Sequence, residues 1–232
     1  MRRVEGGGVS HEALVHELTK TKLFWAGWLE ISSSVILTPS GPLINFSDKA
    51  INIDAISRRL GGSVSLMQNS SSAAIRFSGL TALEIASAVG PLSPSRQKIF
   101  QYFFEWQKSP PDKRSAVVTM AKGCEHWPVA PGDYDDLVDE MQFVAGVLSA
   151  RSSYKSDRLT VGSTNRALLR ALARRYGGQV TPIEPSSKSR RNNWNIPVGP
   201  ARALIALVID NDLFRQMRSR DVARWEQRVS SK

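Results

Sequence analysis

The sequence predicts an α+β protein made of two copies of one αββαββα unit, each with a four-stranded antiparallel sheet. Three matched pairs of segments, in the same order in both halves, support this duplication. The first pair is WAGWLEISSS and VAGVLSARSS, and the second is AISRRLGGSVSLM and ALARRYGGQVTPI. The third pair is AAIRFSGLTALEIASAV and NWNIPVGPARALIALVI. Each third segment reads as a strand, a glycine and then a helix.

Both copies contain the same predicted elements in the same order. A helix opens each copy, at 12–31 and 134–150, and two strands follow, at 33–38 with 42–46 and at 152–155 with 158–162. The next helix, at 48–60 and 164–176, ends at a double glycine because glycine takes the left-handed helix cap at little cost. Two further strands follow, at 63–68 with 73–78 and at 179–184 with 192–198. Helices close the copies at 80–89 with 95–107, and at 200–209 with 212–228.

Alternation of apolar and polar residues predicts that the strands are half-buried. In the first copy Val64 and Leu66 alternate with Ser63 and Ser65, and the segment around Trp194 repeats this pattern. Helices should therefore cover one face of each sheet and leave the other face polar.

The predicted domains are two repeats joined by a linker. Residues 1–107 form the first repeat with an N-terminal extension, and residues 133–232 form a second, strongly basic repeat. Residues 108–132 contain four prolines and lack a clear periodicity, which is typical of a linker.

Charge predicts a polyanionic partner. The formal net charge is +10, and it is concentrated late in the chain: residues 1–141 carry 14 basic and 15 acidic residues, and residues 142–232 carry 17 and 6. A basic half beside a neutral half favours nucleic acid, although a solvated basic surface is the simpler alternative. We expect an intracellular protein without a signal peptide, transmembrane segment or membrane partner, because no apolar run is long enough.

The first helix of each repeat contains one pair of adjacent small residues. Ala26–Gly27 and Ala145–Gly146 occupy matched positions. Small side chains let helix backbones approach closely. These pairs predict that the two helices pack together and make the monomer an internal pseudo-dimer. An ordinary core helix is the alternative.

The repeat pattern resembles the LAGLIDADG homing endonuclease family in its single-chain, two-repeat form. WAGWLEISS and VAGVLSARS lie on the nine-letter motif, and the resemblance covers nearly the whole chain after residue 20. It implies that the motif helices form the interface between repeats. It also implies that the two sheets form a saddle whose polar face lies on DNA.

The resemblance does not carry over the family's metal-binding acids. The eighth motif position, an acid in the family, holds Ser32 and Arg151 here, whereas the sixth holds Glu30 and Ser149. Mg²⁺ prefers carboxylate oxygens in octahedral geometry, which a serine cannot supply alone, and an arginine repels the metal. We therefore expect binding without cleavage and no cofactor. Mg²⁺ is implied only if the protein is an active endonuclease after all.

The expected nucleic-acid-binding residues are polar and basic residues on the polar sheet faces, with Arg151 at the motif. Side chains of these types bind phosphates and base edges. They are Gln68, Arg76, Arg151, Lys155, Arg158, Thr160, Gln179, Thr181, Lys188, Arg190, Arg191, Asn193 and Asn195. For Arg151, drift to a solvent-exposed residue is an equal alternative.

The leading hypothesis is a non-catalytic nucleic-acid-binding protein that favours structured RNA over DNA, because the charge is asymmetric. A splicing cofactor of the maturase type and a ribonucleoprotein component both fit this hypothesis. The alternatives are a DNA-binding regulator and a site-specific double-strand endonuclease that uses acids outside the motif. A structural protein that docks on a larger ribonucleoprotein is a further alternative.

Overall fold

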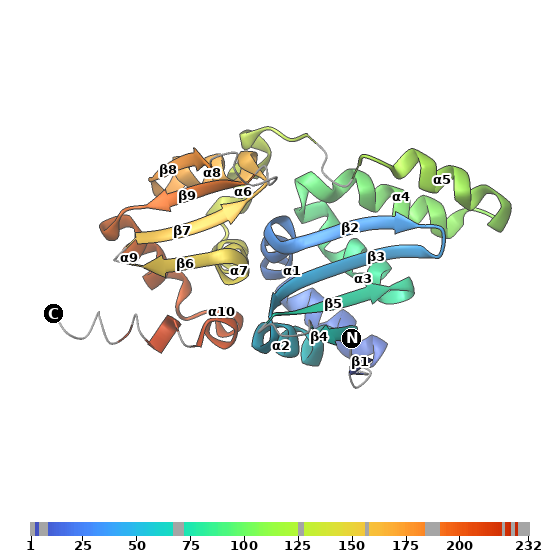
Figure 1. The fold of residues 1–232 in the computed structure, drawn as a ribbon, viewed down its shortest axis with the longest axis horizontal. Helices are drawn as coiled ribbons and strands as arrows, with labels where there is room; N and C mark the ends of the chain where they lie inside the picture. The colour runs from blue at the N-terminus through green and yellow to red at the C-terminus, as the bar shows by residue number, and fades with distance from the viewer. Residues whose placement is uncertain are drawn as a thin grey trace. The chain divides into compact units, whose positions relative to one another are not determined.

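The chain folds as two units, Met1–Val129 (unit 1) and Ala130–Lys232 (unit 2), in a computed structural model. Figure 1 shows helices and antiparallel strands in both. The structure describes residues 3–4, 9–66, 72–124, 128–155, 158–183, 191–219, 221–223 and 226. Each unit has helices on one face of its sheet, as predicted for an α+β fold.

Unit 1 follows the predicted element order, and additional elements precede and follow it. Its elements are β1 (Arg3–Val4), α1 (His11–Ser32), β2 (Ser33–Thr38), β3 (Gly41–Lys49), α2 (Ala50–Leu60), β4 (Ser63–Leu66), β5 (Ser72–Ser78), α3 (Gly79–Val89), η1 (Gly90–Leu92), η2 (Pro94–Arg96), α4 (Gln97–Lys108), η3 (Pro111–Lys113) and α5 (Arg114–Ala121).

Unit 2 repeats the same plan. Its elements are η4 (Pro131–Tyr134), α6 (Asp135–Asp139), α7 (Met141–Arg151), β6 (Ser152–Lys155), β7 (Arg158–Ser163), α8 (Arg166–Tyr176), β8 (Gln179–Pro182), β9 (Asn192–Ile196), α9 (Val198–Val208) and α10 (Asp212–Met217).

The strands of the two sheets are connected in the same way. In unit 1 the order is β1-β4-β5-β3-β2, and in unit 2 it is β6-β7-β9-β8. In both, the second strand of the repeat pairs with the first and the fourth, and the third strand pairs with the fourth. All pairs are antiparallel. The shared order is what the duplication predicts.

The core of each unit lies between the sheet and its helices. In unit 2 the inward residues of β7 and β9, such as Leu159 and Trp194, are fully buried, and α8 packs on these strands. In unit 1, Phe24 of α1 meets Trp25 edge-on with ring centroids 5.2 Å apart. Both rings are buried, and burying rings of this size contributes several kcal/mol each.

The double glycine of each repeat has a steric reason. The first glycine, Gly61 or Gly177, is the C-cap with φ of +72° or +78° and ψ of −146° or −175°, a conformation that favours glycine but differs from the expected left-handed helical cap. At the second glycine of unit 2, Gly178, a Cβ would lie 2.5 Å from the carbonyl oxygen of Asn195. At Gly62 a Cβ would lie 2.8 Å from the Phe77 ring. The second glycine thus lets the chain pass close over the fourth strand of the repeat.

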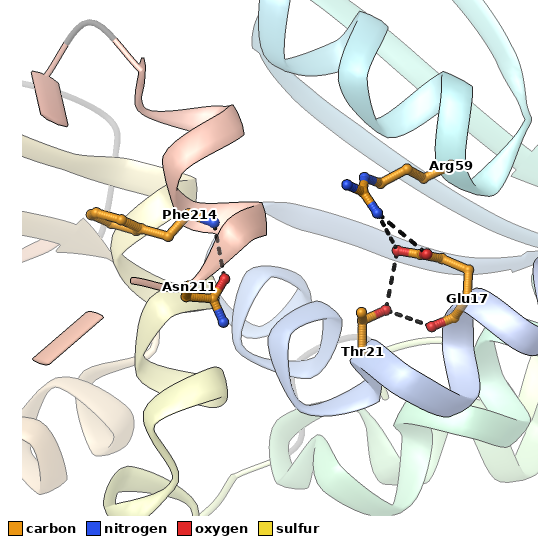
Figure 2. Close-up of polar contacts among 5 residues, drawn as sticks. All are labelled: Glu17, Thr21, Arg59, Asn211 and Phe214. Atoms are coloured by element: carbon orange, nitrogen blue, oxygen red, sulfur yellow. Dashed lines mark hydrogen bonds and ion pairs between the residues drawn. The ribbon is translucent and has the colours of Figure 1, made fainter. Parts of the chain in front are cut away.

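Ion pairs tie the second helix of each repeat to its surroundings. Figure 2 shows Arg59 of α2 donating to both carboxylate oxygens of Glu17 on α1, at 3.2 and 3.3 Å. Thr21 donates to the Glu17 carbonyl oxygen at 2.6 Å in the same view. In unit 2, Arg174 of α8 binds Asp135 of α6 at 2.5 Å. The Arg-Arg pairs of the repeat motif therefore hold helices together.

Several elements differ from the sequence-based expectations. The helix predicted at 134–150 is two helices, because Glu140 is extended and ends α6. Contacts to α8 hold α6 in place, including the bond from the Tyr176 hydroxyl to the Val138 carbonyl oxygen at 2.6 Å. The stretch predicted as a linker contains α5, which packs on α4 and β2 within unit 1.

The helix predicted at 212–228 is interrupted at Arg218, and the described residues Ser219, Asp221–Ala223 and Glu226 beyond it are again helical. Helix α10 begins at an N-cap in which Asn211 Oδ1 accepts from the Phe214 amide at 3.0 Å (Figure 2). It ends at Met217, because Arg218 leaves the helical conformation. In the part of the chain that the structure describes, no helix is long and apolar enough to cross a membrane.

Candidate nucleic-acid interface

A cross-strand row of polar residues occupies the face of the unit 2 sheet that points away from the helices, here called the outer face. Register places Ser153 beside Thr160, Thr160 beside Asn195, and Asn195 beside Gln179. Alternate residues of the same strands, such as Val161 and Trp194, are buried on the helix side. The structure thus brings together three predicted site residues from three strands.

Hydrogen bonds connect this row. The Thr160 hydroxyl donates to Asn195 Oδ1 at 3.2 Å, and Asn195 Nδ2 donates to Thr181 Oγ1 at 2.9 Å. Asn193 lies opposite Gly162 and Thr181 in the next row on this face. The predicted polar residues of β7, β8 and β9 therefore form one continuous surface.

Arginines flank the row. Arg158 is exposed at the start of β7 and pairs in register with Lys155. Arg191 is exposed two residues before Asn193, and its carbonyl oxygen accepts from the Ile183 amide at 3.1 Å, which extends the β8–β9 pairing. Because side chains alternate along a strand, Arg191 lies on the same face as Asn193. Both cations therefore lie on the outer face, on opposite sides of the polar row.

The outer face of unit 1 has the same row with different residues. Register aligns Ser34, Asn45, Arg76 and Ser63 across the four strands. Arg76 is exposed, and its Nε donates to Asn45 Oδ1 at 3.3 Å. In the neighbouring row of unit 1, Ile36 pairs with Leu43.

The two outer faces differ in charge at matched positions. Where unit 2 pairs Lys155 with Arg158, unit 1 pairs Ile36 with Leu43. Both aliphatic residues are half-buried. Register also places the exposed Arg76 and Lys49 on the outer face of unit 1, so among the described residues both faces carry cations, at different positions.

Near the end of the motif helix of unit 1, both carboxylate oxygens of Glu30 accept hydrogen bonds. Glu30 is 2% exposed, and it accepts from the Ser95 amide at 3.1 Å and from the Ser95 hydroxyl at 2.5 Å. Ser32 is buried at the last position of α1. The Ser33 hydroxyl donates back to the Leu29 carbonyl oxygen at 2.6 Å and caps the helix.

The motif helix of unit 2 ends in the same geometry without an acid. Ser152 donates to the Leu148 carbonyl oxygen at 2.5 Å, as Ser33 does in unit 1. Ser149, which matches Glu30, is fully buried. Arg151 is the half-buried last residue of α7, where the family resemblance places an acid.

Two buried arginines that sequence reasoning missed hold these helix ends. Arg96 is 3% exposed and donates to the Ser33 carbonyl oxygen at 3.0 Å. Arg218 is 7% exposed and donates to the Ser152 carbonyl oxygen at 2.7 Å. Both reach the first residue of the first strand of their repeat, although Arg96 precedes α4 and Arg218 follows α10. No sequence pattern distinguishes them from surface arginines.

Some predicted site residues lie outside what the structure describes. Gln68, Lys188 and Arg190 are not among the described residues, and for Lys155 only the backbone is described. Ala26, Gly27, Ala145 and Gly146 are buried in α1 and α7. The contact between the motif helices stays a prediction.

Acids of α6 offset part of the charge in unit 2. Arg174 and Arg175 of α8 bind Asp135 and Asp139 of α6. The hydrogen bond and charge of Asp139 raise the pKa of Arg175, and burial raises the pKa of Tyr176 next to it. The basic helix α8 is therefore partly neutralised on the helix side of unit 2.

The part of the chain that the structure describes contains no cluster of three or more histidine, cysteine, aspartate or glutamate side chains arranged to hold a metal ion. Both carboxylate oxygens of Glu30, the residual motif acid, accept hydrogen bonds from Ser95.

Neither a family model nor a curated protein matches this chain. Solved structures do. The LAGLIDADG homing endonuclease I-SmaMI bound to cleaved DNA matches with a TM-score of 0.60 and 11% identity, over 97% of this chain and 90% of its own. The LAGLIDADG meganuclease I-AabMI bound to uncleaved DNA matches with a TM-score of 0.61 and 10% identity, over 90% and 92%.

The LAGLIDADG homing endonuclease I-LtrWI bound to target DNA matches with a TM-score of 0.58 and 8% identity, over 94% of this chain and 92% of its own. At these identities the likeness concerns the fold, and it extends over both units. This chain therefore has the fold of the single-chain, two-repeat LAGLIDADG homing endonucleases.

Proposed function

We propose that this protein binds nucleic acid on its outer sheet faces, most strongly through unit 2, and does not cleave it. The observation that carries the proposal is the row Thr160–Asn195–Gln179 flanked by the exposed Arg158 and Arg191. Planar guanidinium groups meet phosphate with two hydrogen bonds. Amide and hydroxyl side chains suit base edges and sugars.

The motif residues support binding without cleavage. Ser32 and Arg151 replace the acids that the family resemblance places at the metal site. Glu30 has both carboxylate oxygens bound by Ser95, so using it as a metal ligand would break two buried hydrogen bonds. An arginine at the end of α7 would bind a phosphate more readily than a divalent cation.

Structured RNA is the partner we favour. Where unit 2 pairs Lys155 with Arg158, unit 1 pairs Ile36 with Leu43, so the two outer faces would hold phosphates differently. A folded RNA presents phosphates irregularly and tolerates such a difference. A splicing cofactor or a ribonucleoprotein component fits this mode. The second candidate is a DNA-binding regulator, since I-SmaMI, I-AabMI and I-LtrWI are bound to DNA.

Binding across a salt series tests the partner. Fluorescence anisotropy would compare a folded RNA and a duplex DNA that carry equal numbers of phosphates. We expect tighter binding to the RNA, with log affinity falling with log salt at a slope of about −3 to −5, as for several phosphate contacts. A shallow slope for both would contradict phosphate binding. A preference for DNA would make the regulator the better function.

A further inference from the structure

One position on the fourth strand of each repeat, exposed in unit 1 and half-buried in unit 2, holds a polar side chain in a fixed orientation on the outer face. Arg76 in unit 1 and Asn195 in unit 2 are the third residues of the two matched rows. Each forms a hydrogen bond to a side chain on a neighbouring strand. Each row thus presents one group whose hydrogen-bonding edge is held in place.

Arg76 has the chemistry that reads guanine. Its Nε donates a hydrogen bond to Asn45 Oδ1 at 3.3 Å. The four Nη hydrogens are separate from that bond and form the outer edge of the guanidinium plane. Arg76 stands among short side chains, Ser63 beside it and Ala74 and Ser78 along β5. Two parallel N–H donors on such an exposed edge match the O6 and N7 acceptors of guanine.

Asn195 has the chemistry that reads adenine. Its amide can donate two hydrogen bonds and accept two. Thr160 uses one acceptor site and Thr181 takes one donor, which leaves one of each. One donor and one acceptor on the same amide match N7 and the N6 amino group of adenine.

We infer that Arg76 selects guanine and Asn195 selects adenine in the bound nucleic acid, with Asn45, Thr160 and Thr181 as their positioning residues. This rests on the proposed function and adds which residues set sequence preference. In RNA, such edges are accessible at unpaired nucleotides of loops and bulges. The outer-face strand positions that the structure describes carry no aromatic side chain, so hydrogen bonds to base edges carry the recognition there.

The experiment selects binders from a randomised RNA pool with the full-length protein and sequences the enriched molecules. The wild type should enrich a motif with one fixed guanine and one fixed adenine. Arg76→Ala should lower the guanine preference by about tenfold and keep the adenine, and Asn195→Ala should do the reverse. Gln107→Ala, at an exposed position of α4 on the helix side of unit 1, is the control and should leave the motif unchanged.

The positioning residues are tested by the base preference of the bound RNA, which a purely structural role in folding would not change. Thr181→Val removes the hydroxyl at nearly constant shape and should weaken the adenine preference by about threefold to tenfold, whereas Thr181→Ser should retain it. Asn45→Ala should weaken the guanine preference in the same way. Thermal melting of every variant would confirm that the fold is intact.

The outcomes separate this inference from the proposed function. If the wild type enriches no RNA, the proposed function fails. If it enriches RNA without a fixed guanine and adenine, or if the motif is the same in the Arg76 and Asn195 variants, the base assignments are wrong.

Discussion

Replacing both Arg158 and Arg191 by glutamate is expected to weaken RNA binding by roughly 100-fold or more at moderate salt. Each substitution removes an exposed cation from the outer face of unit 2 and adds an anion that repels phosphate. The salt slope should also become shallower by about 2, one unit for each lost phosphate contact. Anisotropy across a salt series measures both quantities.

The matched control reverses two other arginines of the same unit. Arg166 and Arg170 are exposed on α8, which covers the helix side of the unit 2 sheet. Changing both to glutamate alters the net charge of the protein by the same amount. We expect this control to weaken binding by less than about tenfold through the overall field. If both double variants lose the same affinity, net charge drives binding and the outer face is not the site.

Replacing Glu30 by glutamine is expected to lower the free energy of unfolding by about 2–4 kcal/mol. Glu30 is almost fully buried, and both of its carboxylate oxygens accept from Ser95. A glutamine keeps the shape, but its amino group would face one of these donors. Urea unfolding followed by tryptophan fluorescence measures the loss, since Trp25 and Trp28 lie on the same helix.

Ser149 supplies the matched control for Glu30. It occupies the equivalent position in α7, where it is fully buried, and its hydroxyl has no hydrogen-bond partner among the described residues. Ser149→Ala should therefore change the free energy of unfolding by less than about 1 kcal/mol. A double-mutant cycle of Glu30→Gln with Ser95→Ala should show coupling above about 1 kcal/mol. An unchanged stability for Glu30→Gln would contradict a structural role for this acid.

The duplication made the sheets predictable from sequence. Matched segments identified which strands correspond, and alternation around Trp194 identified the buried face of β9, whereas in β4 Val64 is only half-buried and Leu66 is 41% exposed. The register places Arg76 and Asn195 at equivalent positions, one residue away from the match of AAIRF with NWNIP, which aligns Arg76 with Ile196. Sequence patterns were sufficient for the strand order because the strands of both units pair in the same order.

Other features depend on contacts between distant residues, which local patterns do not encode. The break at Glu140 follows from the contacts of α6 with α8, and β1 forms because β4 offers an edge for pairing. Arg96 and Arg218 read as ordinary surface arginines in the sequence, yet both are buried against strand carbonyl oxygens. Only the tertiary structure shows that these cations complete the helix ends.

The distribution of charge along the sequence was the least reliable guide to the charge of each unit. Dividing the chain at residue 141 assigned the acids from Asp133 to Glu140 to the first half. The structure places them in unit 2, which begins at Ala130, and two of them bind arginines of α8. The basic excess of unit 2 is therefore smaller than residues 142–232 suggest, and among its described cations Arg158 and Arg191 flank the polar row of the sheet.

The central claim is binding without cleavage, and deep sequencing of reaction ends tests it most directly. The purified protein would be incubated with Mg²⁺ or Mn²⁺ and a randomised duplex DNA library, and in parallel with the selected RNA. We predict that bound molecules remain intact, with no ends above those of a protein-free reaction. Site-specific double-strand ends above those of the protein-free reaction would contradict the claim and establish an active endonuclease.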